Sequence, residues 1–219
     1  MTDDTVQKIL DAALMHVPFD GWSEVTLRAA GADAGVDPVV ARALLPRGAV
    51  DLALAYHRRG DDLMAERLRA EDLEALRFRD RIARAVRLRL EVVEDREVVR
   101  RGTTLFALPM HAADGARAIW GTADRIWTEL GDTSDDINWY TKRATLAGVY
   151  SSTVLYWLGD DSLGSQATWD FQIEKVKAQV RGNAFLNKVF AGPNWVLSKV
   201  RAPGAVSDPD LPGRWTSPR

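Results

Sequence analysis

The sequence predicts an all-α fold, and three observations lead to that prediction. Apolar residues recur at helical spacing along almost the whole chain, while the alternating pattern of strands is nearly absent. Proline and glycine divide the chain into about nine or ten segments of ordinary helix length, joined by short loops. Examples of the spacing are Val6, Ile9, Leu10 and Ala13 in the first segment.

The composition is that of a folded domain. The chain has 219 residues, of which 46% are hydrophobic and 27% are charged, with a formal net charge of -2. A chain of this length can bury one sizeable core, which excludes intrinsic disorder of the whole chain. Because there is no cysteine, disulfides, thiolate metal sites and a cysteine nucleophile are also excluded.

The first 20 residues predict a helix start. They contain Asp3, Asp4, Lys8 and Asp11 and have no apolar core of a signal peptide. We therefore expect a bacterial-type chain without a transit peptide, cytoplasmic and peripheral on the cytoplasmic face of the inner membrane. The longest run without Asp, Glu, Lys or Arg extends from Ala144 to Gly159. It is shorter than the roughly 20 residues that cross a bilayer.

Residues 1–60 predict a helix-turn-helix-like subdomain. Three short helical stretches, near 5–17, 24–34 and 38–45, precede a long helix from Ala49. This order resembles TetR-type regulators, in which the third helix enters the major groove. However, the subdomain has six Lys and Arg against eight Asp and Glu, and Arg42 is the only cation in the third stretch. We expect no nucleic-acid partner, although a TetR-like regulator with an apolar effector pocket remains the alternative.

The most distinctive stretch is GDTSDDINWYTKRATLAGVYSSTVLYWLGDDS, at 131–162. On the expected helix, Asp136, Trp139, Tyr140 and Arg143 share one face. Two interpretations remain open. In the first, Asp136 caps the helix and pairs with Arg143 while the aromatic rings fill the core. In the second, the face is a protein-contact site, because Trp, Tyr and Arg are typical of such hot spots.

The chain resembles the TetR-like lipid-binding accessory proteins of coenzyme Q (ubiquinone) biosynthesis. The resemblance covers roughly Phe19 to Phe171 and is carried by FDGWSEVTLRAAGADAG, PRGAVDLALAYHRRGD, GDTSDDINWYTKR and YWLGDDS. It implies a non-enzymatic protein that holds the isoprenoid tail of a quinone intermediate and presents it to a di-iron hydroxylase. The implied hydroxylase contact matches Asp136, Asn138, Trp139, Tyr140 and Arg143. Ile137 departs from the family pattern, which often has an aromatic residue there.

A helical ligand-binding domain is expected at 61–182. An isoprenoid tail has no polar handle, so its site must be an apolar cavity between helices. We therefore expect a bound isoprenoid lipid or phospholipid and no other cofactor. The sequence does not identify the residues that line the cavity. We also expect a homodimer.

Residues 183–201 predict an amphipathic membrane-surface helix. From Phe171 to Arg201 there are six Lys and Arg and one Glu, and apolar residues keep one arc at helical spacing. Gly192 and Pro193 should kink or divide this helix. Residues 202–219 hold four of the nine prolines and predict a disordered tail. The expected membrane-binding residues are Phe185, Leu186, Lys188, Val189, Phe190, Trp195, Val196, Leu197, Lys199 and Val200.

No catalytic or metal-binding motif is recognised. The three histidines, His16, His57 and His111, lie in different segments and lack the paired Glu-x-x-His motifs of di-iron sites. Nucleotide-binding glycine motifs and the GxSxG hydrolase motif are absent as well. We expect no catalytic residues and no metal site, and we interpret His57 as a surface or packing residue.

Overall fold

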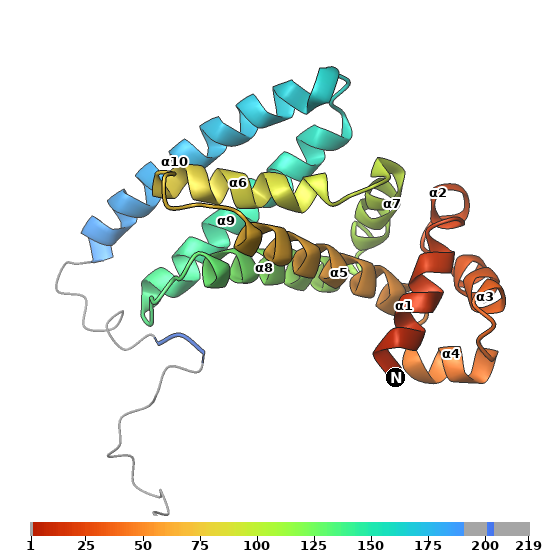
Figure 1. Cartoon of the computed structure of the whole chain (residues 1–219). Coiled ribbons are helices and arrows are strands. Elements are labelled where there is room, and N and C mark those ends of the chain that lie inside the picture. The colour runs from red at the N-terminus through yellow and green to blue at the C-terminus, as the bar shows by residue number, and fades with distance from the viewer. Residues whose placement is uncertain (1, 191–200, 204–219) are drawn as a thin grey trace, which may run out of the picture.

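The computed structural model describes residues 2–190 and 201–203, the side chains of 2 and 183–190 excepted. The described part of the chain contains ten α-helices, one short 3-10 helix and no strand, which confirms the predicted all-α class (Figure 1). The helices are α1 (Thr2–Ala13), α2 (Val17–Asp20), α3 (Glu24–Asp33), α4 (Pro38–Leu44), α5 (Ala49–Ala70), α6 (Phe78–Glu91), α7 (Arg96–Phe106), α8 (Ala112–Glu129), α9 (Ile137–Leu158), η1 (Leu163–Ser165) and α10 (Gln166–Phe190).

Helices α1 to α4 gather at one end of the molecule (Figure 1). They share an apolar cluster, the N-terminal core, with the first half of α5 and with Val98 of α7. Side chains start two of these helices: Ser23 accepts from the Thr26 N–H, and Asp37 accepts from the Val39 N–H. The prediction of a single helix near 5–17 is wrong, because the structure has two helices there. Helix α1 ends at Ala13, and the separate α2 begins at Val17 with Pro18 in its first turn.

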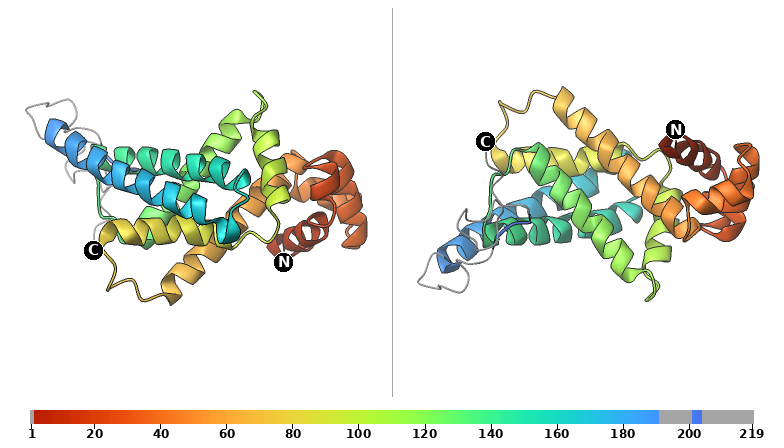
Figure 2. Two further views of the ribbon diagram at one scale, coloured as in Figure 1. Left: turned by 90° about the horizontal axis from the view of Figure 1, so that it is seen from above. Right: turned by 90° about the horizontal axis from the view of Figure 1, so that it is seen from below.

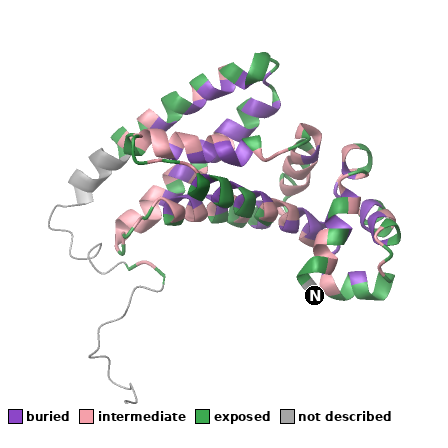
Figure 3. Cartoon of the chain, viewed as in Figure 1, coloured by how far each residue is buried: buried purple, intermediate pink, exposed green. Residues whose placement is uncertain are grey.

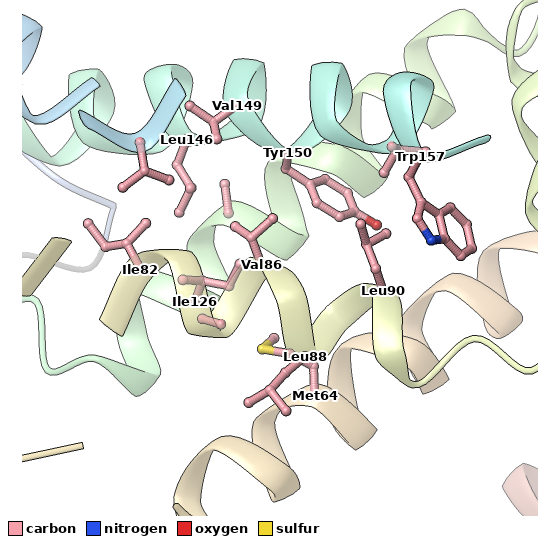
Figure 4. Packing of buried hydrophobic residues seen from close by; sticks show 14 of the residues in the cluster. Met64, Ile82, Val86, Leu88, Leu90, Ile126, Leu146, Val149, Tyr150 and Trp157 are labelled. Carbon is pink, nitrogen blue, oxygen red and sulfur yellow. The ribbon is translucent and has the colours of Figure 1, made fainter. Parts of the chain in front are cut away.

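The remaining helices form a bundle in which α9 packs against α8 and α10, and α5 packs against α6 and α8 (Figures 1 and 2). Their inward faces make a second apolar cluster, the bundle core. Figure 4 shows Ile82 and Val86 of α6 meeting Leu146 of α9, with Ile126 of α8 close by. The buried residues lie on the facing sides of these helices, as expected for amphipathic helices (Figure 3).

Two of the three predicted domain boundaries, those at 60 and 182, fall inside helices. Residue 60 lies in the middle of α5, which contributes Leu52 to the N-terminal core and Met64 to the bundle core. Helix α10 runs without a break across residue 183 to Phe190. The division at 60, 182 and 201 stays a prediction. Within the described residues, none of the helices is both long enough and apolar enough to span a membrane.

Candidate ligand cavity and partner surface

A cavity of about 390 Å³ lies between helices α5, α6, α7, α8 and α9. Its lining is mainly apolar and includes Leu90, Val93, Val99, Phe106, Ile119 and Val154. We call it the main cavity. Its volume falls in the range of small-molecule sites, roughly 300 to 1,000 Å³. An apolar chain placed there would be held by the area that it removes from water.

One end of the main cavity is polar. Arg89 of α6 is 3% exposed, and its Nε donates to Asp61 Oδ1 at 2.7 Å. Thr122 Oγ1 of α8 donates to the same Asp61 oxygen at 2.8 Å and lies 2.8 Å from His57 Nε2. We call His57, Asp61, Arg89 and Thr122 the polar cluster. In this cluster, residues of three helices, α5, α6 and α8, provide the hydrogen bonds that the buried ion pair of Arg89 and Asp61 requires.

Burial changes the protonation of the residues around the polar cluster. It lowers the pKa of His57 to about 4, and the nearby charge of Arg89 acts in the same direction. Burial also raises the pKa of Tyr150, which lines the cavity from α9, to about 12. Figure 4 shows Tyr150 beside Leu90, and both residues line the main cavity. At neutral pH both side chains are therefore uncharged.

The polar cluster is not among the sites predicted from the sequence. His57, interpreted there as a surface or packing residue, is largely buried and lines the cavity. A signal was available: His57, Gly60 and Asp61 recur at helical spacing and so share one face of α5. A single helix face does not reveal its partner, however, and Arg89 lies 28 positions further along the chain from Asp61.

A second cavity of about 610 Å³ adjoins the first. It is bordered by α1, α5 and the segment that joins α6 to α7. Tyr56, Arg89, Val93 and Val98 line both cavities, so these four side chains form the wall between them. The second cavity also meets charged side chains such as Arg59 and Glu94, and it is the more polar of the two.

The predicted partner residues lie at the start of α9. Asp136 caps the helix, because its Oδ1 accepts from the Asn138 N–H at 2.8 Å, and its Oδ2 accepts from Asn138 Nδ2 at 2.9 Å. Trp139 and Tyr140 are half-buried and meet edge to face with ring centres 4.8 Å apart. Trp139 also lies 6.0 Å from Trp120 of α8. Asp136, Asn138, Trp139 and Tyr140 therefore form one half-exposed patch, which we call the partner surface.

Arg143 lies beneath this patch and not on its surface. It is 2% exposed, and it donates to Asp132 Oδ2 at 2.9 Å and to Asp124 Oδ1 at 2.5 Å. The pairing of Arg143 with Asp136 in our first interpretation is therefore wrong, since Asp136 is occupied at the helix start. Burial acts to raise the pKa of Asp132, but hydrogen bonds from Lys142 and Arg143 outweigh it and leave the pKa below its ordinary value.

A short C-terminal segment contacts the same region. The Tyr140 hydroxyl donates to the Arg201 carbonyl at 3.1 Å, and the Ala202 N–H donates to the Asp135 carbonyl at 2.8 Å. The expected membrane-binding residues Phe185 to Phe190 lie in the last turns of α10. The others, Trp195 to Val200, lie outside the described residues.

Helix α4 corresponds to the third stretch of the sequence analysis, and Arg42 is its one basic residue. Val39 is 77% exposed, and Val40 is also exposed. The guanidinium of Arg42 donates to Glu24 Oε2 at 2.8 Å, so it is paired within the chain. Among the described residues, moreover, there is no group of three or more His, Asp or Glu side chains that could hold a metal ion.

Comparison with known proteins identifies relatives of the chain. Residues 112–181 match the sequence profile of the COQ9 family. The "Ubiquinone biosynthesis protein COQ9, mitochondrial" of Drosophila melanogaster is 31% identical over 186 residues, which cover 83% of this chain and 57% of that protein. The probable Dictyostelium discoideum counterpart is 28% identical over 191 residues, covering 83% of this chain and 62% of that protein. The chain thus spans about three fifths of the length of these relatives.

These names correct one expectation. The relatives from fly, slime mould and fission yeast are each named as mitochondrial, so the predicted cytoplasmic, bacterial-type location is wrong. The composition of the first 20 residues was an unsound basis for it.

A solved structure extends the comparison to the fold. The TetR transcriptional regulator from Nitrosomonas europaea superposes with a TM-score of 0.65 at 19% identity, covering 80% of this chain and 97% of that chain. At this identity the likeness concerns the fold, and it confirms the predicted TetR-like arrangement. The profile match and the similarity along most of the sequence show that the chain is a relative of the COQ9 proteins.

Proposed function

We propose that this chain is a non-catalytic, lipid-binding accessory protein of ubiquinone biosynthesis. In this proposal the main cavity holds the isoprenoid part of a quinone intermediate, and the protein presents that intermediate to a di-iron hydroxylase at a membrane surface. The relatives are named as ubiquinone biosynthesis proteins. The observation that carries the proposal is the main cavity, whose volume and mainly apolar lining suit a hydrocarbon chain.

The partner surface supports the second half of the proposal. Trp139 and Tyr140 are half-exposed aromatic residues, and packing against Trp120 and Arg143 fixes the ring of Trp139. Rigid aromatic side chains of this kind contribute strongly to protein interfaces, since little conformational freedom is lost on binding. We propose that the hydroxylase docks here, that the end of α10 meets the membrane, and that the protein acts as a homodimer.

The alternative of a DNA-binding regulator has less support. Its fold is that of TetR proteins, but α4 exposes valines where base-reading residues would be needed, and Arg42 is paired with Glu24. A mobility-shift assay with genomic fragments tests it. Sequence-selective and salt-dependent retention would favour the regulator over the accessory protein.

The lipid content of the purified full chain tests the main proposal. We expect organic extraction followed by mass spectrometry to recover an isoprenoid lipid or a phospholipid from the native chain. Ser151 lines the cavity from α9, so Ser151→Phe should fill part of it and lower the recovered lipid severalfold. Ala144→Phe, on an exposed position of the same helix away from the lining, should leave the recovery unchanged. Equal recovery from both variants, or none from the native chain, would contradict the proposal.

A further inference from the structure

The Arg89 guanidinium has N–H donors that the polar cluster does not use. Arg89 directs its Nε to Asp61 and its Nη2 to the His57 carbonyl, at 2.7 and 3.0 Å. Its Nη1 makes no hydrogen bond to any residue in the described part of the chain. Arg89 lines both cavities although it is only 3% exposed. The Nη1 nitrogen is not among the side-chain atoms that the described residues enclose completely, so a ligand in the cavity can reach it.

Two neighbouring residues of α5, Gly60 and Asp61, keep the Arg89 guanidinium at the cavity wall. Gly60 lies directly against the guanidinium, and a Cβ atom at position 60 would come within 2.5 Å of Arg89 Cζ. A residue larger than glycine would therefore displace Arg89 from the cavity wall. Asp61, one position further along α5, then fixes the orientation of the same guanidinium.

The charges around the unused donor are already balanced. Arg89 and Asp61 form an ion pair with 4% and 13% of their side chains exposed. His57, Tyr56 and Tyr150 also lie near Arg89, and burial keeps all three uncharged at pH 7. A phosphate or carboxylate would bring an uncompensated charge into this buried site, at a high desolvation cost. A neutral oxygen would accept the hydrogen bond without that cost.

We propose that the polar end of the main cavity binds a neutral oxygen of an amphiphilic ligand, a carbonyl, hydroxyl or ether group, through Arg89. This inference rests on the proposed function, because it takes the apolar remainder of the cavity to hold the ligand's hydrocarbon chain. It adds a head-group class and the residue that recognises it. It also separates ligands with neutral heads from phospholipids and prenyl phosphates, whose heads are charged.

Three probes with the same C15 chain test the inference on the full chain. They are farnesene, which has no oxygen, farnesol, which has a neutral hydroxyl, and farnesyl phosphate, which has a charged head. Competition against a fluorescent fatty alcohol measures their dissociation constants. We expect farnesol to bind about fivefold more tightly than farnesene, the effect of one net hydrogen bond, and farnesyl phosphate to bind more weakly than farnesol.

Arg89→Lys keeps the positive charge beside Asp61. It removes the guanidinium and with it the Nη1 donor that is proposed to bind the ligand. It should abolish the preference for farnesol over farnesene. Arg96→Lys is the matched control, because Arg96 lies over the ring of Trp157 in the same bundle and does not line the cavity. It should keep the preference.

Each outcome has a distinct meaning. Equal binding of farnesol and farnesene, or tightest binding of farnesyl phosphate, overturns the neutral-oxygen site and leaves the lipid cavity standing. Failure of all three probes to bind overturns the lipid cavity and the head-group site together. Because the comparison of probes uses the native chain, it decides the matter even if Arg89→Lys does not fold.

Discussion

The guanidinium carbon of Arg143 lies 4.0 Å from the ring centre of Trp139, one turn earlier on α9. Arg143 is buried and ion-paired below, with Asp132 and Asp124, while Trp139 is half-exposed above. The buried ion pairs therefore support the aromatic ring of the partner surface from beneath. This relationship separates two roles that the sequence pattern had merged: Trp139 is available to a partner, and Arg143 holds it in place.

Removing Arg143 should destabilise the fold. Arg143→Leu leaves Asp132 buried with Lys142 as its one remaining cation. Breaking a buried ion pair in this way costs about 3–5 kcal/mol, and urea unfolding of the purified chain measures it. Arg42→Leu is a suitable control, because Arg42 and Glu24 are both more than half exposed and should contribute at most about 1 kcal/mol. Equal losses in the two variants would contradict the assignment.

Removing Trp139 should lower the affinity for the partner and leave the protein folded. Trp139→Ala deletes a half-exposed ring and leaves the ion pairs of Arg143 in place. We expect a folded protein whose affinity for the hydroxylase falls by about 2 kcal/mol or more, as at interface hot spots. A titrated pull-down, with circular dichroism as the folding check, measures both quantities. Unchanged affinity would show that the hydroxylase binds elsewhere.

Acid should destabilise the fold through His57. Its pKa is about 4 in the fold and about 6.5 in an unfolded chain. Between these values the unfolded chain takes up a proton that the fold does not, so stability falls as the pH falls. From pH 7 to pH 5 this amounts to about 2 kcal/mol. Over the same pH interval, the free energy of unfolding of His57→Gln should fall by about 2 kcal/mol less than that of the native chain. The carboxylates titrate alike in both proteins, so their contribution cancels in this comparison. Parallel pH profiles would refute a neutral, buried His57.

Two glycines in helix interiors should respond in opposite directions to alanine. A Cβ at Gly60 would collide with Arg89, so Gly60→Ala should destabilise the fold by about 1–3 kcal/mol. A Cβ at Gly148 of α9 meets nothing within 4 Å among the described residues, so Gly148→Ala should stabilise the helix by about 0.5–1 kcal/mol. Thermal unfolding of the two variants distinguishes them, and a stable Gly60→Ala protein would mean that Arg89 can move aside.

The helices could be predicted from the sequence because their signals are local. Apolar spacing, the Ser23 and Asp37 caps and the glycine turns each act within a few residues. The short α2 was missed, since Pro18 reads equally well as a break and as the first turn of a new helix.

The candidate sites could be predicted only in part, for the opposite reason. The patch of Asp136, Trp139 and Tyr140 could be predicted because these residues are neighbours on one helix, and its role in partner binding stays a prediction. The ion-pair partners of Arg143 could not be predicted. Asp124 lies on another helix, α8, and the sequence offers several acidic residues as possible partners. The polar cluster joins α5, α6 and α8, and its pairing depends on how these helices pack. The periodicity of apolar residues predicts which face of a helix points inward, but it does not predict which residues of other helices that face contacts.

The basic segment at 183–201 should bind anionic membranes through its charge. Each lysine near such a surface contributes about 1 kcal/mol, so replacing both Lys188 and Lys199 with Gln should weaken binding to phosphatidylserine-containing liposomes by about 2 kcal/mol. Deleting the whole segment is the less specific test, because Arg201 also contacts Tyr140.

Sedimentation with anionic and with neutral liposomes measures the effect. The double variant should differ from the native chain on the anionic liposomes alone, since only there does the lysine charge act. Arg42→Gln, which removes a cation at the far end of the molecule, should sediment as the native chain does (Figure 1). If the double variant and the native chain sediment alike on anionic liposomes, Lys188 and Lys199 do not bind the membrane, and any membrane contact must be sought on another surface of the bundle.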